Sequence, residues 1–371
     1  MIYFDNAATT AIDENILNVM LPYFKIYYGN PSALHSTGRE AKNAINAARN
    51  NISNSINCEK NEVFFAASAS ECNNIALEIL INANKSKGNH ILCSNIEHPS
   101  VLNTVEKYRK YGYKIDYAEA NDNGIVTEKE LQAKLRNDTC VVAIMHVNNE
   151  IGSVQDIQTL CRLSHNNGSM FYSDTVQSIG HCNIDFKSFG LDAMCISSHK
   201  IYGPKGIACL ILNENIKYDP FIYGGGQERN LISGTENVPG IVAISKAIEI
   251  AVKDQESNSE YLTKLRSYFL DKISNIKILF ELNSDLNNSV SNIVNIRLNG
   301  KRNDAVLSRL DMMGICVSAG SACSSGIIEK HGTVSKIKNS DIKAAESIRI
   351  SFSKYNTFKD IDYLVNALNN L

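Results

Sequence analysis

The first 255 residues alternate between short, almost continuously apolar runs and longer stretches in which apolar residues recur every three or four positions. Runs of the first kind are typical of strands buried on both faces, and repeats of the second kind are typical of helices. This alternation predicts an α/β fold with a mostly parallel central sheet covered by helices. The predicted strands are 63–65, 90–93, 113–117, 140–145, 170–173, 192–196 and 207–212, and the predicted helices are 71–81, 99–111, 127–135, 157–166 and 239–253.

The pattern changes after residue 255, where polar segments become more frequent. A predicted helix at 261–273 leads to a segment rich in Asn, Ser and Asp, then to a strand at 293–298 and a helix at 303–313. We therefore predict two domains. They are a large one at 15–255 and a smaller α+β one formed by 1–14 plus 256–371.

Two local signals refine this outline. Thr127 and Glu130 have the spacing of a capping box, which predicts the start of the helix at 127–135. Three consecutive glycines followed by charged residues predict a flexible, charged loop at 224–229.

Two polar residues at strand ends point to a cofactor. Lys200 follows the strand at 192–196 and precedes a Gly-Pro turn. A lysine at the end of a buried strand suits Schiff-base chemistry, because desolvation lowers its pKa and leaves free amine. Asp174 follows another predicted strand. Pyridoxal phosphate needs a lysine for its aldehyde and an acid for its pyridine nitrogen, so the pair favours this cofactor over a solvated surface lysine.

Three more strand ends carry candidate residues. The backbone at 67–71 and the Ser70 hydroxyl can bind a phosphate, although a plain serine cap is the commoner structure. His98 can stack on a flat ring and move protons, or be a structural histidine. Asn148 and Asn149 can offer amides to a phenolic oxygen, or form a turn.

Two segments favour substrate chemistry. The segment at about 318–330 begins with small residues only, which predicts a mobile loop that exposes Cys323. An exposed thiol is a liability unless it is used, so we interpret Cys323 as a nucleophile, whereas Cys316 lies in an apolar run that favours burial. None of the ten cysteines forms a C-x-x-C pair, which weakens a zinc interpretation. Arg349 can clamp a carboxylate in bidentate fashion, or lie on the surface of an edge strand.

Composition and charge narrow the class of protein. The chain has 371 residues and a formal net charge of −2, which argues against nucleic acid or a membrane surface as the main partner. No apolar run approaches the roughly 18 residues of a membrane span. The N-terminal sequence lacks the basic region and apolar core of a signal peptide, so we expect a cytoplasmic protein.

In this order and spacing, the motifs resemble those of the cysteine desulfurases. These are fold-type-I pyridoxal-phosphate enzymes of the class-V aminotransferase superfamily that serve iron–sulfur cluster assembly and nitrogen fixation. The resemblance covers nearly the whole chain, and the lysine turn and the cysteine segment are its most specific parts. The matching segments are 3–10, 29–32, 97–98, 146–152, 174–177, 198–206, 233–235, 318–323 and 347–351.

The resemblance implies conversion of L-cysteine to L-alanine in a homodimer. It implies that Cys323 takes the sulfur as a persulfide for an acceptor protein, such as an iron–sulfur scaffold, or for thiolation. By the same resemblance Lys200 binds the cofactor covalently, His98 is catalytic and stacks on its ring, and Arg349 binds the substrate carboxylate. The other implied contacts are Asp174 with the pyridine nitrogen, Gln177 and Asn149 with the phenolic oxygen, Asn149 also with substrate, and Ala69, Ser70, Ser197, His199 and Thr235 of the second subunit with the phosphate. No metal site is expected, apart from iron–sulfur ligation by Cys323 as an open alternative.

Three departures from the family pattern keep alternatives open. Ser68 stands where the family usually has glycine, Ile232 stands where it usually has arginine, and the segment 327–342 looks unlike the family. A serine at position 68 is strained if the site needs a positive φ. The alternatives are a selenocysteine lyase or aminotransferase of the same fold, and a degenerate relative that acts as a partner-binding module.

Overall fold

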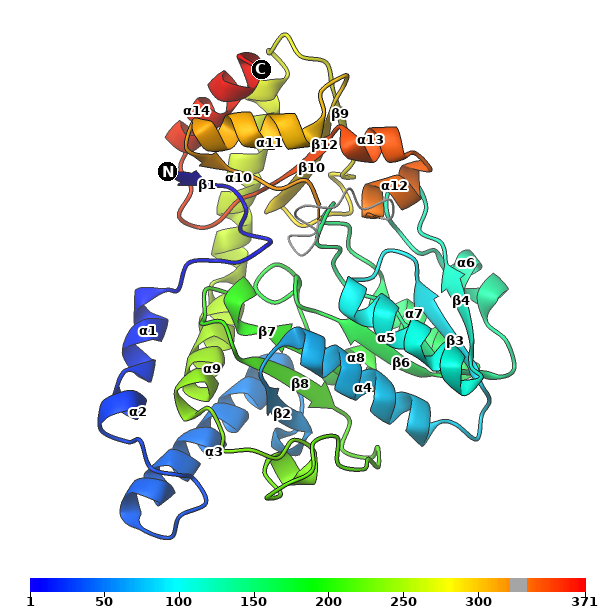
Figure 1. The fold of residues 1–371 in the computed structure, drawn as a ribbon, viewed down its shortest axis with the longest axis vertical. Coiled ribbons are helices and arrows are strands. Elements are labelled where there is room, and N and C mark those ends of the chain that lie inside the picture. Colours follow the sequence, from blue (N-terminus) through cyan, green and yellow to red (C-terminus); the bar gives the residue numbers. More distant parts are fainter. Residues whose placement is uncertain (321–331) are drawn as a thin grey trace.

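The computed structural model of the protein describes residues 1–320 and 332–371, and it is built around a seven-stranded sheet (Figure 1). The strand order is β2-β8-β7-β6-β5-β3-β4, and the five strands from β7 to β4 are parallel. Strand β8 is antiparallel to both neighbours, because the short turn after β7 is too short for the crossover that a parallel strand needs. The predicted mostly parallel sheet is confirmed. The strands are β2 (Val63–Ala66), β3 (His90–Ser94), β4 (Lys114–Ala118), β5 (Thr139–Ala143), β6 (Met170–Asp174), β7 (Ala193–Ser197) and β8 (Ala208–Leu212).

Helices cover both faces of this sheet, and alternate strand residues feed two apolar clusters. In β2, Phe65 packs with α3 and α9, whereas its neighbour Phe64 packs with α4 on the other face. Burial on both faces explains why these strands are apolar throughout. The covering helices are α3 (Ser36–Ile56), α6 (Glu128–Lys134), α7 (Ile157–Asn166) and α9 (Val238–Lys253) on the first face, and α4 (Ala69–Ala83) and α5 (Pro99–Lys107) on the second.

Charged side chains close the edge of the sheet at β2. The carbonyl of Val63 accepts hydrogen bonds from Arg49 and from Arg229, the latter at 2.6 Å. The Glu228 carboxylate accepts from the Phe65 amide at 2.8 Å and pairs with Arg49. These groups replace a missing neighbour strand, so another chain cannot pair with this edge. The prediction of a flexible, charged loop at 224–229 is therefore wrong at Glu228, which is buried.

The C-terminal part forms its own layer, at the top of Figure 1. The antiparallel sheet β12-β10-β9 and the helices around it share an apolar cluster that also takes in Phe4. The predicted division at residue 255 stays a prediction, and this separate cluster supports it. The elements are α10 (Gln255–Ile273), β9 (Phe280–Leu282), β10 (Ile293–Leu298), α11 (Asn303–Met312), β12 (Ser347–Ser351) and α14 (Phe358–Asn369), with β1 (Ile2–Tyr3) parallel to β11 (Ile315–Cys316).

Local capping explains where the sequence misjudged element bounds. Helix α4 begins at Ala69 because the Ser68 hydroxyl accepts a hydrogen bond from the Glu71 amide at 3.2 Å. The capping box of α6 is only half formed. The Thr127 hydroxyl accepts from the Glu130 amide at 3.1 Å, but the Glu130 carboxylate accepts from the amide of Glu119, the residue after β4, at 3.0 Å. Elements that were not predicted include α14, α1 (Glu14–Met20), α2 (Pro22–Lys25), α8 (Phe186–Phe189), α12 (Thr333–Lys338), α13 (Asp341–Ala345) and the 3-10 turns at Lys60–Glu62, Ser198–Lys200 and Glu228–Asn230. The last part of the predicted helix 99–111 is a 3-10 turn, Tyr108–Tyr111.

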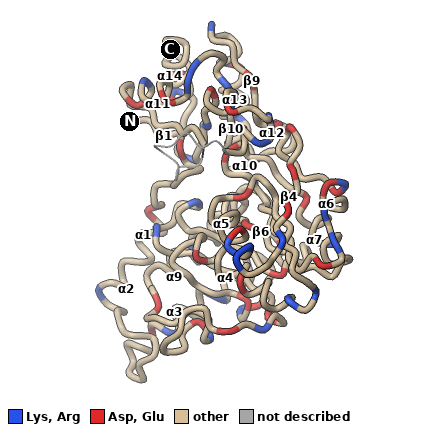
Figure 2. Tube along the Cα trace, turned by 45° about the vertical axis from the view of Figure 1, so that its right-hand side comes forward, with Lys and Arg blue, Asp and Glu red and all other residues tan. Residues whose placement is uncertain are grey.

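Charges are spread over the molecule. Figure 2 shows basic and acidic residues interspersed over both layers, in keeping with the small net charge. Across residues 1–320 and 332–371, no helix has both the length and the apolar character that crossing a membrane requires.

Candidate active site

A cavity of about 1060 Å³, counted with its open mouth, lies where several strands of the seven-stranded sheet end. The N-terminal segment and β12 close its other side. Thr235 is exposed and is not among its described lining residues, and Cys323 lies outside the described residues. The predicted site residues that line the cavity are Ala69, Ser70, His98, Asn149, Asp174, Gln177, Ser197, His199, Lys200 and Arg349.

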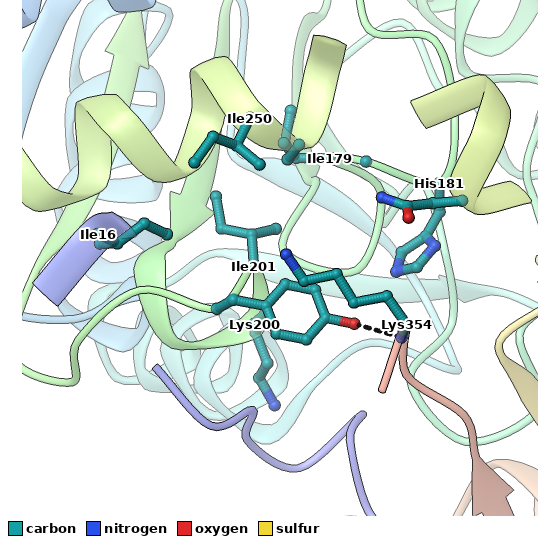
Figure 3. A pocket seen from close by; sticks show the side chains of 11 residues that line it. Ile16, Ile179, His181, Lys200, Ile201, Ile250 and Lys354 are labelled. Atoms are coloured by element: carbon teal, nitrogen blue, oxygen red, sulfur yellow. Dashed lines mark hydrogen bonds between the residues drawn. The ribbon is translucent and has the colours of Figure 1, made fainter. Parts of the chain in front are cut away.

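Lys200 reaches this cavity from the short turn that follows β7. Its amine donates hydrogen bonds to the carbonyls of Ala7 and, at 2.7 Å, Ala8. The next residue, Ile201, is buried, and Figure 3 shows it on the side of Ile250 while the Lys200 side chain points the other way. The two neighbouring side chains therefore leave the turn in opposite directions. The isoleucine enters an apolar pocket and the lysine amine enters the cavity.

A second cluster fixes the same turn from outside. The Tyr202 ring packs edge-on against Tyr355 at 5.5 Å, and the Lys354 ammonium lies 4.7 Å from its centroid. Asp13 accepts from Lys354 at 2.6 Å and from Tyr355 at 2.8 Å. Burial alone would raise the pKa of Asp13, but these bonds and that of the Asn15 amide lower it to about 2. The carboxylate thus stays ionised. Asp13 also donates its backbone N–H to the Tyr202 carbonyl at 2.8 Å, so this residue ties the lysine turn to the segment after β12.

Asp174 ends β6 with its carboxylate buried at the cavity floor. One oxygen accepts from the Val176 amide and the other from the Asn73 side chain, each at 3.0 Å. A buried carboxylate of this kind fits the protonated ring nitrogen of pyridoxal phosphate.

His98 lies at the start of α5, where it also caps the helix. Its Nδ1 accepts a hydrogen bond from the Ser100 amide at 3.1 Å. The functional and structural interpretations of this histidine are therefore not exclusive: the ring lines the cavity while it caps α5.

The N-terminal end of α4 forms a site suited to an anion. The first amides of a helix have no intrahelical partners, and the Ser70 and Ser197 side chains line the same end of the cavity. Burial, then the nearby charges of Lys200 and Lys205, lower the pKa of His199 to about 4. The two ammonium groups that repel a proton there attract a phosphate. Ser68 has an extended φ of −158°, so the strain considered for it is absent.

Arg349 lies in β12 with its guanidinium at the cavity wall. It is 1% exposed, so the alternative of a surface arginine is wrong. It donates to the Asp5 carboxylate at 2.7 Å and to the Asn149 carbonyl at 2.8 Å. Its Nε has no hydrogen-bond partner among the described residues. A buried guanidinium with one unpaired N–H fits a carboxylate ligand.

The protein-family model described as "Aminotransferase class-V" matches residues 2–364. The cysteine desulfurase IscS of Dictyoglomus turgidum is 37% identical over 367 residues, which cover 99% of this chain and 93% of that protein. The chain belongs to the cysteine desulfurase family of class-V aminotransferases. The predicted family and fold type are confirmed.

Further relatives of this cysteine desulfurase agree. The putative cysteine desulfurase IscS 1 of Bacillus subtilis is 36% identical, over 97% of this chain and 95% of that one. A solved NifS-like protein superposes with a TM-score of 0.93 at 31% identity, covering 100% and 98% of the two chains. A structure of SspA in complex with cysteine gives a TM-score of 0.83 at 31% identity, covering 96% and 100%.

The sequence missed the residues that support the desulfurase cavity from outside the strand ends. Asp5 holds Arg349, Asn73 holds Asp174, and the Ala7 carbonyl accepts from both Lys200 and, at 2.9 Å, Gln177. The first of these joins positions 344 residues apart, and no local pattern links such positions. Asn73 lies one turn into α4, and its polar character on a buried helix face was the available signal.

Proposed function

We propose that this cysteine desulfurase converts L-cysteine to L-alanine and that Cys323 receives the sulfur as a persulfide. The observation that carries the proposal is the pairing of Ser318 with Arg349, whose backbones bond in both directions at 2.6 and 3.1 Å. Cys323 follows Ser318 by five positions, which span at most about 17 Å. A thiol on that tether can reach a substrate whose carboxylate is held by Arg349.

The residues around the cavity fit pyridoxal phosphate, and we assign its contacts accordingly. Bound pyridoxal phosphate withdraws electrons from the substrate's α-carbon and so weakens the carbon–sulfur bond. Lys200 is the amine for its aldehyde, Asp174 pairs with its ring nitrogen and His98 stacks on its ring. The remaining assignments are Gln177 and Asn149 to the phenolic oxygen, and Ala69, Ser70, Ser197 and His199 to the phosphate.

Arg349 orients the substrate, since its buried guanidinium offers an unpaired N–H beside the Asn149 carbonyl. Asn149 itself contributes an amide to substrate or cofactor. The Cβ–S bond of cysteine breaks, an S–S bond to Cys323 forms, and the thiol proton of the enzyme and that of the substrate remain in the products. Cysteine and thiol thus become alanine and persulfide with no added oxidant. Cys323 attacks as a thiolate.

A homodimer completes the proposed site with Thr235 of the second subunit. Support comes from exposed apolar side chains in the segment that follows α1. Figure 1 shows the backbone of this segment, with α2, at one side of the molecule. Phe24, Ile26, Tyr28 and Leu34 are 59%, 61%, 73% and 92% exposed. Clustered exposure of this size is typical of a subunit interface.

The sulfur acceptor follows from the chemistry of a persulfide. A second thiolate attacks its outer sulfur and regenerates Cys323. We propose a protein acceptor of this kind, such as an iron–sulfur scaffold. The cytoplasmic location stays a prediction.

Mass spectrometry after incubation with L-cysteine tests the function. We expect one added sulfur atom on the peptide that contains Cys323, together with alanine, and sulfide when a reductant is present. Alanine release with no modified cysteine would refute the persulfide. Release of selenide from selenocysteine without release of sulfur from cysteine would favour the selenocysteine lyase. Amino transfer without sulfur release would favour an aminotransferase. A protein that binds no cofactor and acts on no amino acid would be the degenerate module.

A further inference from the structure

A buried polar network runs beneath the cavity from Asp174 to His98, and its centre is Asn73. The Asn73 Oδ1 accepts hydrogen bonds from the Tyr172 hydroxyl and, at 3.0 Å, from the Cys195 thiol. Its Nδ2 donates to Asp174 at 3.0 Å and to the Ser100 hydroxyl at 2.7 Å. Asn73 is buried, and these four bonds use both N–H groups and both oxygen lone pairs of its side-chain amide.

The direction of these bonds is fixed by Asp174. A carboxylate only accepts hydrogen bonds, so the nitrogen of the Asn73 amide faces it, and a flipped amide would place oxygen against oxygen. The same nitrogen donates to the Ser100 oxygen. The Ser100 hydroxyl therefore has to direct its own proton elsewhere, and the His98 Nδ1 lies 2.7 Å away.

The backbone of Ser100 gives the same answer independently. Its N–H donates to the His98 Nδ1 at 3.1 Å, and a backbone N–H cannot be turned around. Two donors thus converge on this nitrogen. A ring nitrogen that accepts hydrogen bonds carries no proton, so the neutral ring carries its proton on Nε2.

We propose that Ser100, oriented by Asn73, is a positioning residue that holds His98 as a neutral ring with its proton on Nε2. The inference deepens the proposed function, on which the role of His98 in turnover rests. A proton added at Nδ1 would face the Ser100 N–H and would break the cap of α5. In the enzyme without substrate, His98 therefore offers an N–H hydrogen-bond donor at Nε2.

The tautomer can be observed directly in the holoenzyme without substrate. The protein is prepared with 15N-labelled histidine, and two-bond proton–nitrogen correlation spectra distinguish the two neutral tautomers from the imidazolium ion. The sequence has eight histidines, and the signals missing from a His98→Gln sample assign His98. We expect the Nε2–H form at neutral pH. A proton on Nδ1, whether in the other tautomer or in the imidazolium ion, would overturn the proposal.

Ser100 variants test the cause. Ser100→Ala removes the nearer of the two donors at Nδ1 and keeps only the backbone N–H, so we expect the Nε2–H form to remain the major one while a minor form with a proton on Nδ1 becomes detectable. Ser100→Thr keeps the hydroxyl and should restore the wild-type pattern. Unchanged signals in Ser100→Ala would show that the hydroxyl does not position the ring. These spectra do not depend on turnover. They can therefore refute the proposed tautomer while the desulfurase activity is confirmed, or confirm the tautomer in a protein that lacks the activity.

Kinetics supply a second readout. We expect Ser100→Ala to lower kcat about 10-fold while KM changes less than about twofold, because the substrate's own contacts are intact. Ser100→Thr should recover most of the rate. The matched control is Ser308→Ala, an exposed serine of α11 whose hydroxyl bonds only a carbonyl of its own helix among the described residues. Equal losses in Ser100→Ala and Ser308→Ala would count against a specific role.

Discussion

The two sides of the cavity are built in different ways. The floor consists of residues at or just beyond strand ends, among them His98, Asp174 and Lys200, and the seven-stranded sheet places them. The wall consists of Arg349 from β12 and the N-terminal segment, and it forms only when the two ends of the chain meet. Floor residues are thus set by buried strands, whereas the wall depends on an ion pair between distant positions. Loss of a wall contact should therefore leave the floor residues in place, whereas no wall residue can compensate for the loss of a floor residue.

The largest effect is expected for Lys200→Ala on the floor. It removes the amine proposed for the cofactor aldehyde, so we expect no covalent cofactor and no measurable turnover. The fold should persist because Ile201 still fills its pocket. The measurements are the visible absorption band, alanine release and circular dichroism. The control is Lys129→Ala, an exposed lysine of α6, which should keep the band. A Lys200→Ala protein that desulfurates cysteine would show that the site is misassigned.

Cys323→Ser separates cofactor chemistry from sulfur transfer. We expect the variant to keep the cofactor band and its spectral response to cysteine, since neither floor nor wall is altered. Persulfide formation should fall at least about 100-fold, because a hydroxyl is a far weaker nucleophile near neutral pH. Cys316→Ser is the control. Cys316 is half-buried, less than its apolar run suggested, and desolvation raises the pKa of its thiol, which lowers the fraction of reactive thiolate. Near-normal sulfur transfer by Cys323→Ser would end the proposed mechanism.

Asp5→Asn tests the wall. The variant removes the charge that pairs with the buried Arg349, so the guanidinium loses its fixed position while the floor stays intact. We expect kcat/KM for cysteine to fall about 10- to 100-fold, mainly through KM, with the cofactor band unchanged. Asp304→Asn, in an exposed ion pair with Arg302, is the control and should have no effect. Loss of the cofactor band in Asp5→Asn would mean that wall and floor are not independent.

The same contrast explains what the sequence could predict. Apolar runs locate buried strands, and the residues that follow them, such as Lys200 and Asp174, face the cavity because parallel strands end together. Of the wall, the sequence indicated only Arg349, as a possible ligand of a carboxylate. Its partner Asp5 is 344 positions away, and only tertiary structure brings them together. Asn73 was missed for a similar reason, because its partners come from three other elements. The roles of Cys323 and Thr235 stay predictions.

The free energy of unfolding should depend on pH through Glu97, the residue before His98. Burial raises the pKa of Glu97 from 4.5 to about 8, although hydrogen bonds from Ser94 and the Met145 amide oppose this. The native protein then keeps a proton that the unfolded chain releases near 4.5. The stability gained from this proton is complete below about pH 4.5 and is lost as pH rises to about 8.

We therefore expect Glu97→Gln, which stays neutral, to become more stable relative to wild type as pH rises. The difference should grow by as much as a few kcal/mol and level off above about pH 8. Urea unfolding of the cofactor-free proteins at about pH 5, 7 and 8.5 measures it. A difference that does not change with pH would show that Glu97 is ionised in the native state.

The smallest effect is expected at Ile232, which belongs to neither side. Ile232 is half-buried against the apolar cluster of α4 and bridges to Ile222, so the local structure accommodates an apolar residue. A long arginine side chain can keep its stem on such a cluster while its charge reaches water or a second subunit. Because a charge-assisted contact with a phosphate contributes about 1.5–3 kcal/mol at most, part of it offset by lost packing, we expect Ile232→Arg to strengthen cofactor retention a few-fold or leave it unchanged. Dialysis followed by absorbance measures retention, and Ile222→Arg is the matched control. A clear loss of cofactor in Ile232→Arg alone would show that the surroundings of position 232 require an apolar residue. It would also make the proposed subunit boundary a third side of the cavity with its own requirements.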